Sequence, residues 1–167
     1  GFFATADSGL PVSFTLVSGP ILLAGSKVNI KGAGSVTIRA SQSGDATYAP
    51  APDVELTFDI LAAPLTVTAD NQSRTYGTTN PPLTLTYTGF VYGETNDVLA
   101  TPPTVQSSAA PTNDVGPYPI VVFGGSDTNY SFSYVTGQLN VTSAPLTAKA
   151  NDAARVYGAT NPPFSIS

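Results

Sequence analysis

The stretch Arg74–Pro82 reads RTYGTTNPP, and the stretch Arg155–Pro163 reads RVYGATNPP. Both phrases belong to a longer internal repeat. Ala63–Thr86 and Ala144–Ser167 align without a gap at an offset of 81, and 12 of 24 positions are identical. Self-similarity at a fixed period is the signature of a modular chain in which each copy is one folding unit.

A weaker echo connects the first third of the chain to its middle. Gly34–Tyr48 reads GSVTIRASQSGDATY and Gly116–Tyr130 reads GPYPIVVFGGSDTNY, with Gly, Asp and Tyr in register at an offset of 82. The two echoes predict three parts. Residues 1–62 form a module without its opening strand, residues 63–143 form a complete module, and residues 144–167 are the opening strands of a further module.

The composition predicts an all-β fold. Apolar residues make up 41% of the chain, enough for a packed core, and the 15 Gly and 15 Pro leave no long run with helical periodicity. Short alternating segments separated by turn residues are typical of a β-sandwich. We expect strands at Val12–Val17, Ile21–Leu23, Lys27–Lys31, Ser35–Ala40, Val54–Ile60, Leu65–Ala69, Leu83–Tyr87, Thr104–Ser107, Ile120–Phe123, Ser131–Tyr134 and Gln138–Val141.

The repeated phrase itself has the chemistry of a turn. Gly77 can adopt a positive φ, and Asn80 before Pro81 is pushed out of the helical region. A proline near the start of each repeat limits the angle between neighbours, which suits a semi-rigid rod. We therefore expect structural joint and turn roles, with the tyrosine rings packed on the module ends, for Pro64, Pro145, Tyr76, Gly77, Asn80, Pro81, Tyr157 and Gly158.

We also predict structural roles for two tyrosines and for the aspartates of the turns. Tyr48 and Tyr130 end the echoed segments, and we expect each to be a corner tyrosine bonded to nearby backbone. Five aspartates are spread singly through predicted turns, and we expect them to bond the local backbone: Asp45, Asp53, Asp70, Asp127 and Asp152.

The same composition argues against several function classes. The formal net charge is −5 with only six Lys and Arg, so no basic footprint for a nucleic acid exists. The chain has no His and no Cys, which removes imidazole and thiolate chemistry. Calcium prefers several neighbouring carboxylates, and no Asp-x-Asp cluster occurs. We expect no enzyme activity, no catalytic or metal residue and no cofactor, with calcium as the weak alternative.

The motifs of the middle module resemble a known family. They are Tyr76-Gly77 followed by Asn80-Pro81-Pro82, then Tyr87–Phe90, Gly116–Ile120 and Asn129–Phe132. On these residues, Ala63–Ser143 resembles the MBG domain of YGX type, a repeat of large bacterial surface proteins. Gly1–Ile60 is similar to Ig-like repeats of the same proteins. The resemblance implies tandem Ig-like β-sandwich modules of about 80 residues in an extended array.

The resemblance also implies a function and a place. We expect a structural segment of a bacterial stalk, fibre or adhesin at the cell surface, whose partners are neighbouring modules or identical subunits in a linear array. The alternative is an adhesive module that binds a glycan or a surface protein through loops at the sandwich end, with Tyr92 and Tyr118 as the best candidates.

Two interpretations of the outer parts stay open. Residues 1–167 can be a segment of a longer repeat chain, or the copies can join head to tail. In the second case a tail strand that carries Phe164 and Ile166 completes the first module of the next copy, since strand addition to a free edge is an established mode of recognition.

Overall fold

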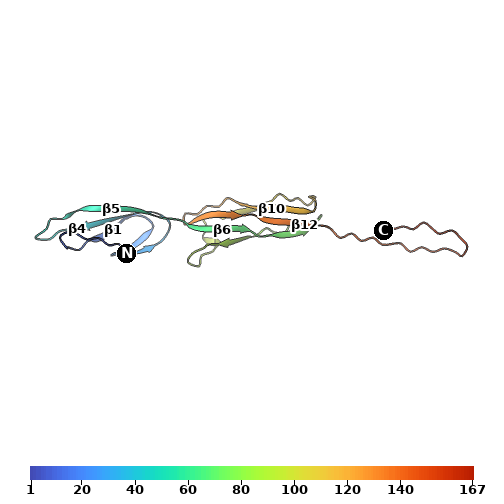
Figure 1. Ribbon diagram of the computed structural model, residues 1–167, viewed down its shortest axis with the longest axis horizontal. Helices are drawn as coiled ribbons and strands as arrows, with labels where there is room; N and C mark the ends of the chain where they lie inside the picture. The colour runs from blue at the N-terminus through green and yellow to red at the C-terminus, as the bar shows by residue number, and fades with distance from the viewer.

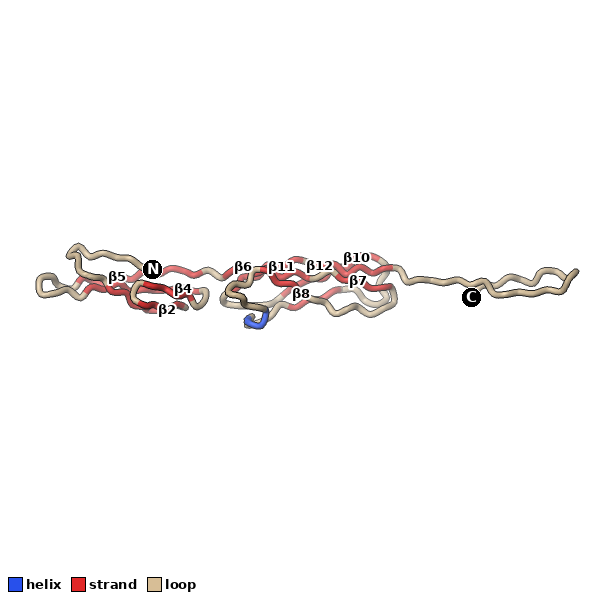
Figure 2. Tube along the Cα trace, turned by 90° about the horizontal axis from the view of Figure 1, so that it is seen from below, coloured by secondary structure: helices blue, strands red, loops and turns tan.

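The computed structural model describes every residue from Gly1 to Ser167. It is all-β apart from one turn of 3-10 helix, η1 (Asn96–Val98), and no helix is long and apolar enough to cross a membrane. Three parts follow one another along a single axis (Figures 1 and 2). We name them the N-terminal unit (residues 1–60), the central unit (63–142) and the C-terminal hairpin (144–167).

The N-terminal unit contains two small sheets. One has the order β1-β4-β5, with antiparallel neighbours, and the other is the antiparallel pair β2-β3. Ile21, Val36 and Ile38 are its buried apolar residues, and Phe2, Phe14 and Phe58 pack against them. The strands are β1 (Ser13–Ser18), β2 (Ile21–Ala24), β3 (Lys27–Ile30), β4 (Gly34–Gln42) and β5 (Ala51–Ile60).

The central unit encloses the larger core between a sheet of order β7-β12-β10-β9 and a sheet of order β11-β6-β8. Leu65, Val67 and Ala69 of β6 face inward at alternate positions, opposite Ile120 and Leu139. Each fully buried aliphatic side chain contributes about 1.5–3 kcal/mol. The strands are β6 (Ala63–Ala69), β7 (Gln72–Thr75), β8 (Leu85–Thr88), β9 (Thr104–Ser107), β10 (Gly116–Phe123), β11 (Tyr130–Val135) and β12 (Gly137–Thr142).

All eleven predicted strands overlap strands of the structure, and the all-β prediction is confirmed. One strand was missed. The repeated phrase was expected to be turn throughout, but its first two residues end β7, which pairs in parallel with β12. The hydrophobic pattern could not predict β7, because its only buried side chain is that of Arg74.

Arg74 explains why the phrase begins with Arg and continues to Asn-Pro-Pro. Arg74 is 6% exposed, and its guanidinium donates from Nε to Asn80 Oδ1 at 2.8 Å and from Nη2 to the Ala110 carbonyl at 2.5 Å. Asn80 in turn donates from Nδ2 to the Ala109 carbonyl at 2.7 Å. The two side chains therefore tie the turn to the loop that precedes β10, and together we name them the Arg74–Asn80 latch.

The C-terminal hairpin reproduces the pairing of β6 with β8 at the repeat offset. Ala69 pairs with Leu85 in the central unit, and Ala150 pairs with Ile166 in the hairpin. Burial differs completely, however: Leu65 is fully buried and its counterpart Leu146 is 96% exposed. The counterpart of Arg74 is Arg155, which is exposed and bonds to the Ala159 carbonyl instead of an asparagine.

We predict that Asn80→Ala lowers the free energy of unfolding of the central unit by about 2–3 kcal/mol. The substitution leaves Nε of the buried Arg74 guanidinium and the carbonyl of buried Ala109 without their partner, while the bond from Arg74 Nη2 to the Ala110 carbonyl remains. Urea denaturation checks the value, and the matched control Asn161→Ala, at the exposed repeat position, should leave stability unchanged. Equal effects of the two substitutions would contradict the latch.

We also predict that Asp70 contributes to the stability of the central unit in an acid-sensitive way. Its side chain was expected to bond local backbone, but it bonds two threonine side chains instead. Its carboxylate accepts hydrogen bonds from Thr84 (2.6 Å), directly before β8, and from Thr86 (2.7 Å), within β8, and these bonds lower its pKa below the ordinary 3.8. A carboxyl group whose pKa is lower in the folded state stabilises the fold at pH values above its unfolded-state pKa. This stabilisation is lost as the pH falls through the folded-state pKa.

The stability difference between wild type and Asp70→Asn should therefore shrink as the pH falls below 3.8. Urea denaturation followed through amide signals of β6 and β8 measures it. Asp152→Asn is the control, because the Asp152 side chain is exposed in the hairpin. A difference that stays constant across this pH range would refute the assignment.

Candidate functional site

The joint between the N-terminal and central units is the part of the molecule where two units meet. Only Leu61 and Ala62 separate β5 from β6. The predicted joint ran to Pro64, but the structure places Pro64 inside β6, paired in register with Ser131. A connection of two residues leaves little room for the two units to turn independently.

Asn129 connects both sides of this joint. Its Oδ1 accepts a hydrogen bond at 2.9 Å from the backbone N–H of Ala33. Ala33 lies in the N-terminal unit, just before β4. Its own carbonyl accepts from Ala63 N–H at 2.8 Å, at the first residue of β6. A Cβ added at Gly32 would lie 2.9 Å from Asn129 Oδ1, so the glycine is needed for this close approach.

Asp127 fixes the backbone around Asn129. Its Oδ1 accepts from Asn129 N–H at 2.7 Å, and its Oδ2 accepts from Ala100 N–H at 3.1 Å. The first bond is the local backbone contact expected for this residue. Asp45, at the equivalent place of the N-terminal unit, likewise accepts from the N–H groups of Thr47 and Tyr48, and these bonds lower its pKa.

Tyr130 anchors a second loop beside the joint. Its side chain is 3% exposed, and its hydroxyl donates to Glu94 Oε2 at 2.5 Å and accepts from Val91 N–H at 3.1 Å. Burial, followed by the bond to Glu94, raises the pKa of this tyrosine. The bonds reach a loop that lies far upstream in the sequence, so Tyr130 ties loops together across the unit. Tyr48 was wrongly predicted to be a corner tyrosine, because it is 50% exposed and its hydroxyl has no partner.

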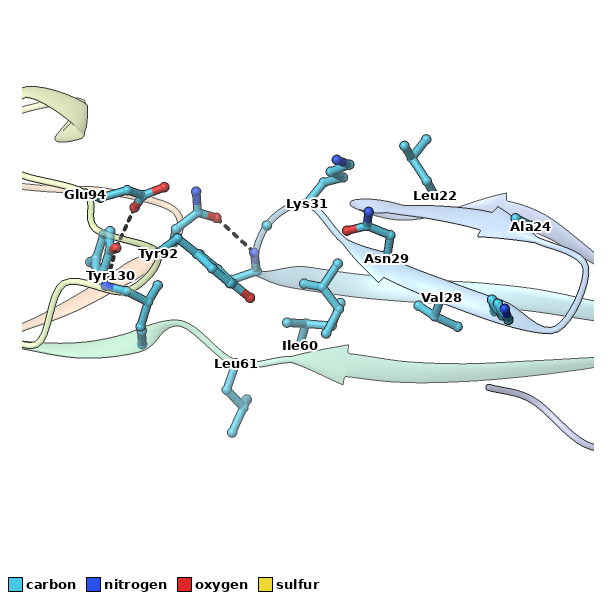
Figure 3. Close-up of a pocket in the computed structure, with 17 residues that line it drawn as sticks. Leu22, Ala24, Val28, Asn29, Lys31, Ile60, Leu61, Tyr92, Glu94 and Tyr130 are labelled. Carbon is cyan, nitrogen blue, oxygen red and sulfur yellow. Dashed lines mark hydrogen bonds between the residues drawn. The ribbon is translucent and has the colours of Figure 1, made fainter.

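A cleft of about 980 Å³ lies at the joint and is walled by both units (Figure 3). The N-terminal unit contributes β3, the residues that follow it and Ile60, and the connection contributes Leu61. The central unit contributes the loop that carries Tyr92 and Glu94, together with Asn129 and Tyr130. Most of the lining is apolar, which is typical of a surface that receives a partner.

Tyr92 stands out in the wall of this cleft. It is the one non-glycine residue with a positive φ, 56°, and its side chain is 87% exposed. Tyr118, the other predicted aromatic contact, is a β10 residue whose hydroxyl donates to the Asp114 carbonyl at 3.0 Å and does not line the cleft. The structure therefore brings no pair of predicted aromatics together at one site.

The predicted turn residues lie at the other end of the central unit. Tyr76 N–H donates to the Thr142 carbonyl at 2.8 Å, which places the Tyr76-Gly77 turn beside the connection to the hairpin. Tyr157 is fully exposed, so the expected packing of its ring is wrong, whereas Tyr76 is 45% exposed and its packing stays a prediction. The remaining predicted residues of the hairpin are also exposed: Pro145, Gly158, Phe164 and Ile166.

Sequence reasoning missed the residues that make the contacts. An arginine begins both copies of the repeated phrase, at Arg74 and Arg155, so this recurrence could have indicated a structural role for Arg74. Asn129 and Glu94 carried no such signal, because their partners Ala33 and Tyr130 are 96 and 36 residues away. The structure brings no three acidic side chains together in a group that could hold a metal ion.

Comparison with known proteins identifies one part of the chain. Residues 65–140 match the family model of the MBG domain (YGX type). No curated protein matches the chain, and no solved structure matches it. The match confirms the MBG part of the resemblance for the central unit, while the Ig-like resemblance of residues 1–60 stays a prediction.

Proposed function

We propose that this chain is a structural segment of an extracellular bacterial stalk, fibre or adhesin, built from β-sandwich modules in series. The observation that carries the proposal is the Asn129 bridge, in which one side chain of the central unit bonds the backbone of the N-terminal unit. The match of residues 65–140 to the MBG domain supports a surface-associated setting.

The mechanical argument starts from the length of the connection. Two linker residues and the paired bonds of Asn129 oppose bending at the joint. Each unit buries its own cluster of apolar residues, so the units meet mainly through the joint. An array of this kind behaves as a one-dimensional series whose stability is close to a sum over units and joints.

The C-terminal hairpin supports continuation of the series. It repeats the β6–β8 register at an offset of 81 while its apolar residues stay exposed. We propose that strands like β9 to β12 cover this hairpin in the assembled array. Such strands can come from the same polypeptide or from a second copy.

The role proposed here is non-enzymatic and needs no cofactor. An adhesive role for the loops would rest on Tyr92 alone, since Tyr118 does not reach the same surface. The structural role is therefore the one that we develop.

We predict that Asn129→Ala loosens the joint without unfolding either unit. The bond to Ala33 lies at the surface, where a hydrogen bond contributes about 0.5–1.5 kcal/mol. The melting temperatures should therefore change little, while small-angle X-ray scattering should show a broader distribution of maximum dimensions. Gly32→Ala should act in the same direction, because the added Cβ meets Asn129 Oδ1.

Thr47→Ala is the matched control, since Thr47 occupies the repeat position of Asn129 in the N-terminal unit and its side chain is exposed. It should leave the scattering curve of the wild type unchanged. If Asn129→Ala and Gly32→Ala both scatter like the wild type, the bridge does not set the shape of the rod and the proposal fails.

A further inference from the structure

The first and the last strands of the central unit lie side by side and run in the same direction. β6 pairs in parallel with β11 over six register positions, and β7 pairs in parallel with β12 over four. We name residues 63–76 the opening segment and residues 129–142 the closing segment. The two segments are thus paired along most of their length, although they are far apart in the sequence.

The chain enters and leaves this pairing at opposite ends of the central unit. The N-terminal unit connects to the start of β6, and the hairpin connects to the end of β12. Figure 1 shows that β6 and β12 run along the long axis, from the joint toward the hairpin. Tension along the chain therefore pulls the opening segment toward the N-terminal unit and the closing segment toward the hairpin. Such a pull slides the segments past each other and strains all the bonds between them at once.

Further hydrogen bonds close both ends of the paired region. At the joint, Ala63 N–H donates to the Asn129 carbonyl at 2.8 Å. At the far end, Tyr76 N–H donates to the Thr142 carbonyl at 2.8 Å, and Thr142 Oγ1 donates to the Arg74 carbonyl at 3.2 Å. Neither end of the pairing is therefore left open as a place where separation could start.

Asn71 bridges the gap between the two parallel ladders. It lies in the bend between β6 and β7, and its Oδ1 accepts a hydrogen bond from Gln138 N–H, near the start of β12, at 2.8 Å. The segments approach so closely here that a Cβ added at Gly137 would overlap the Ala69 carbonyl oxygen. The contact between the segments is therefore continuous from one ladder to the other.

We propose that the parallel pairing of the opening and closing segments is a clamp that resists tension, so that the central unit transmits force between its neighbours without unfolding. The inference rests on the proposed function, because a segment within a stalk or fibre is pulled from both ends. It goes beyond that function, because the stiffness of a joint and the resistance of a unit to extension are separate properties. Forced unfolding is governed by the unfolding rate and not by equilibrium stability.

Single-molecule force spectroscopy with two directions of pulling tests the clamp. The chain has no cysteine, so two introduced cysteines give unique points of attachment. Leu61→Cys with Ser143→Cys pulls the central unit along its axis, and Leu61→Cys with Thr128→Cys pulls apart the starts of β6 and β11. All three positions are exposed. The length released should match the segment between the two attachment points, at about 3.3–3.6 Å per residue.

The axial direction should require a force several-fold higher than the second direction. Axial pulling strains both ladders together, whereas the second direction opens the pairs one after another, beginning with Ala63 and Tyr130. Urea denaturation of both double variants checks that they are folded and equally stable, so that the difference in force reports the direction alone. Equal forces in the two directions, or a lower force along the axis, would overturn the proposal.

Asn71→Ala tests the contact between the two ladders. It removes the acceptor of Gln138 N–H, so it should lower the axial unfolding force. It should leave the force in the second direction unchanged, because the first pairs to open there lie at the other end of β6. Asn140→Ala is the matched control, since Asn140 is exposed on β12, and it should change neither force.

An equal drop in both directions on Asn71→Ala would assign this residue to general stability and would also overturn the proposal. The clamp is measured within the central unit, and the rigidity of the joint is measured by scattering. Failure of the clamp therefore leaves the test of the Asn129 bridge unaffected.

Discussion

The opening strand of each repeat cannot bury its own apolar face, and the rest of the structure depends on this constraint. β6 is the middle strand of its sheet, flanked by β8 and by the parallel β11. Leu65 and Val67 are fully buried there, whereas Leu146, at the repeat position of Leu65, is 96% exposed in the hairpin. Equivalent positions of the repeat are thus core or surface according to whether later strands cover them.

The difference shows which interactions are local and which need the whole unit. Backbone pairing is local, because the same bond forms in both copies. Asp70 N–H donates to the Thr84 carbonyl at 3.1 Å in the central unit, and Asn151 N–H donates to the Ser165 carbonyl at 3.0 Å in the hairpin. The Arg74–Asn80 latch is not, since it closes on carbonyls of Ala109 and Ala110 that the hairpin lacks. The hairpin therefore adopts the register of the opening strands without their packing energy.

The same distinction explains what the sequence could predict. Alternation of apolar residues located β6 and β12, because an inward-facing side chain at every second position is a local property of a strand. β7 was not predicted because its one buried residue is charged. Burial of an arginine is tolerated only when it is hydrogen-bonded, and here a bond comes from a distant loop, at the Ala110 carbonyl. Asn129 escaped for the same reason, as its partner Ala33 belongs to another unit.

The two ends of the central unit differ in how they hold a neighbour. At the joint, a side chain of the later unit bonds the backbone of the earlier one through Asn129 and Ala33. At the other end, the Tyr76 turn bonds Thr142 within its own unit. The bond across the joint therefore depends on the fold of the later unit, because Asp127 bonds the backbone of Asn129 and Tyr130 ties the neighbouring loop to Glu94.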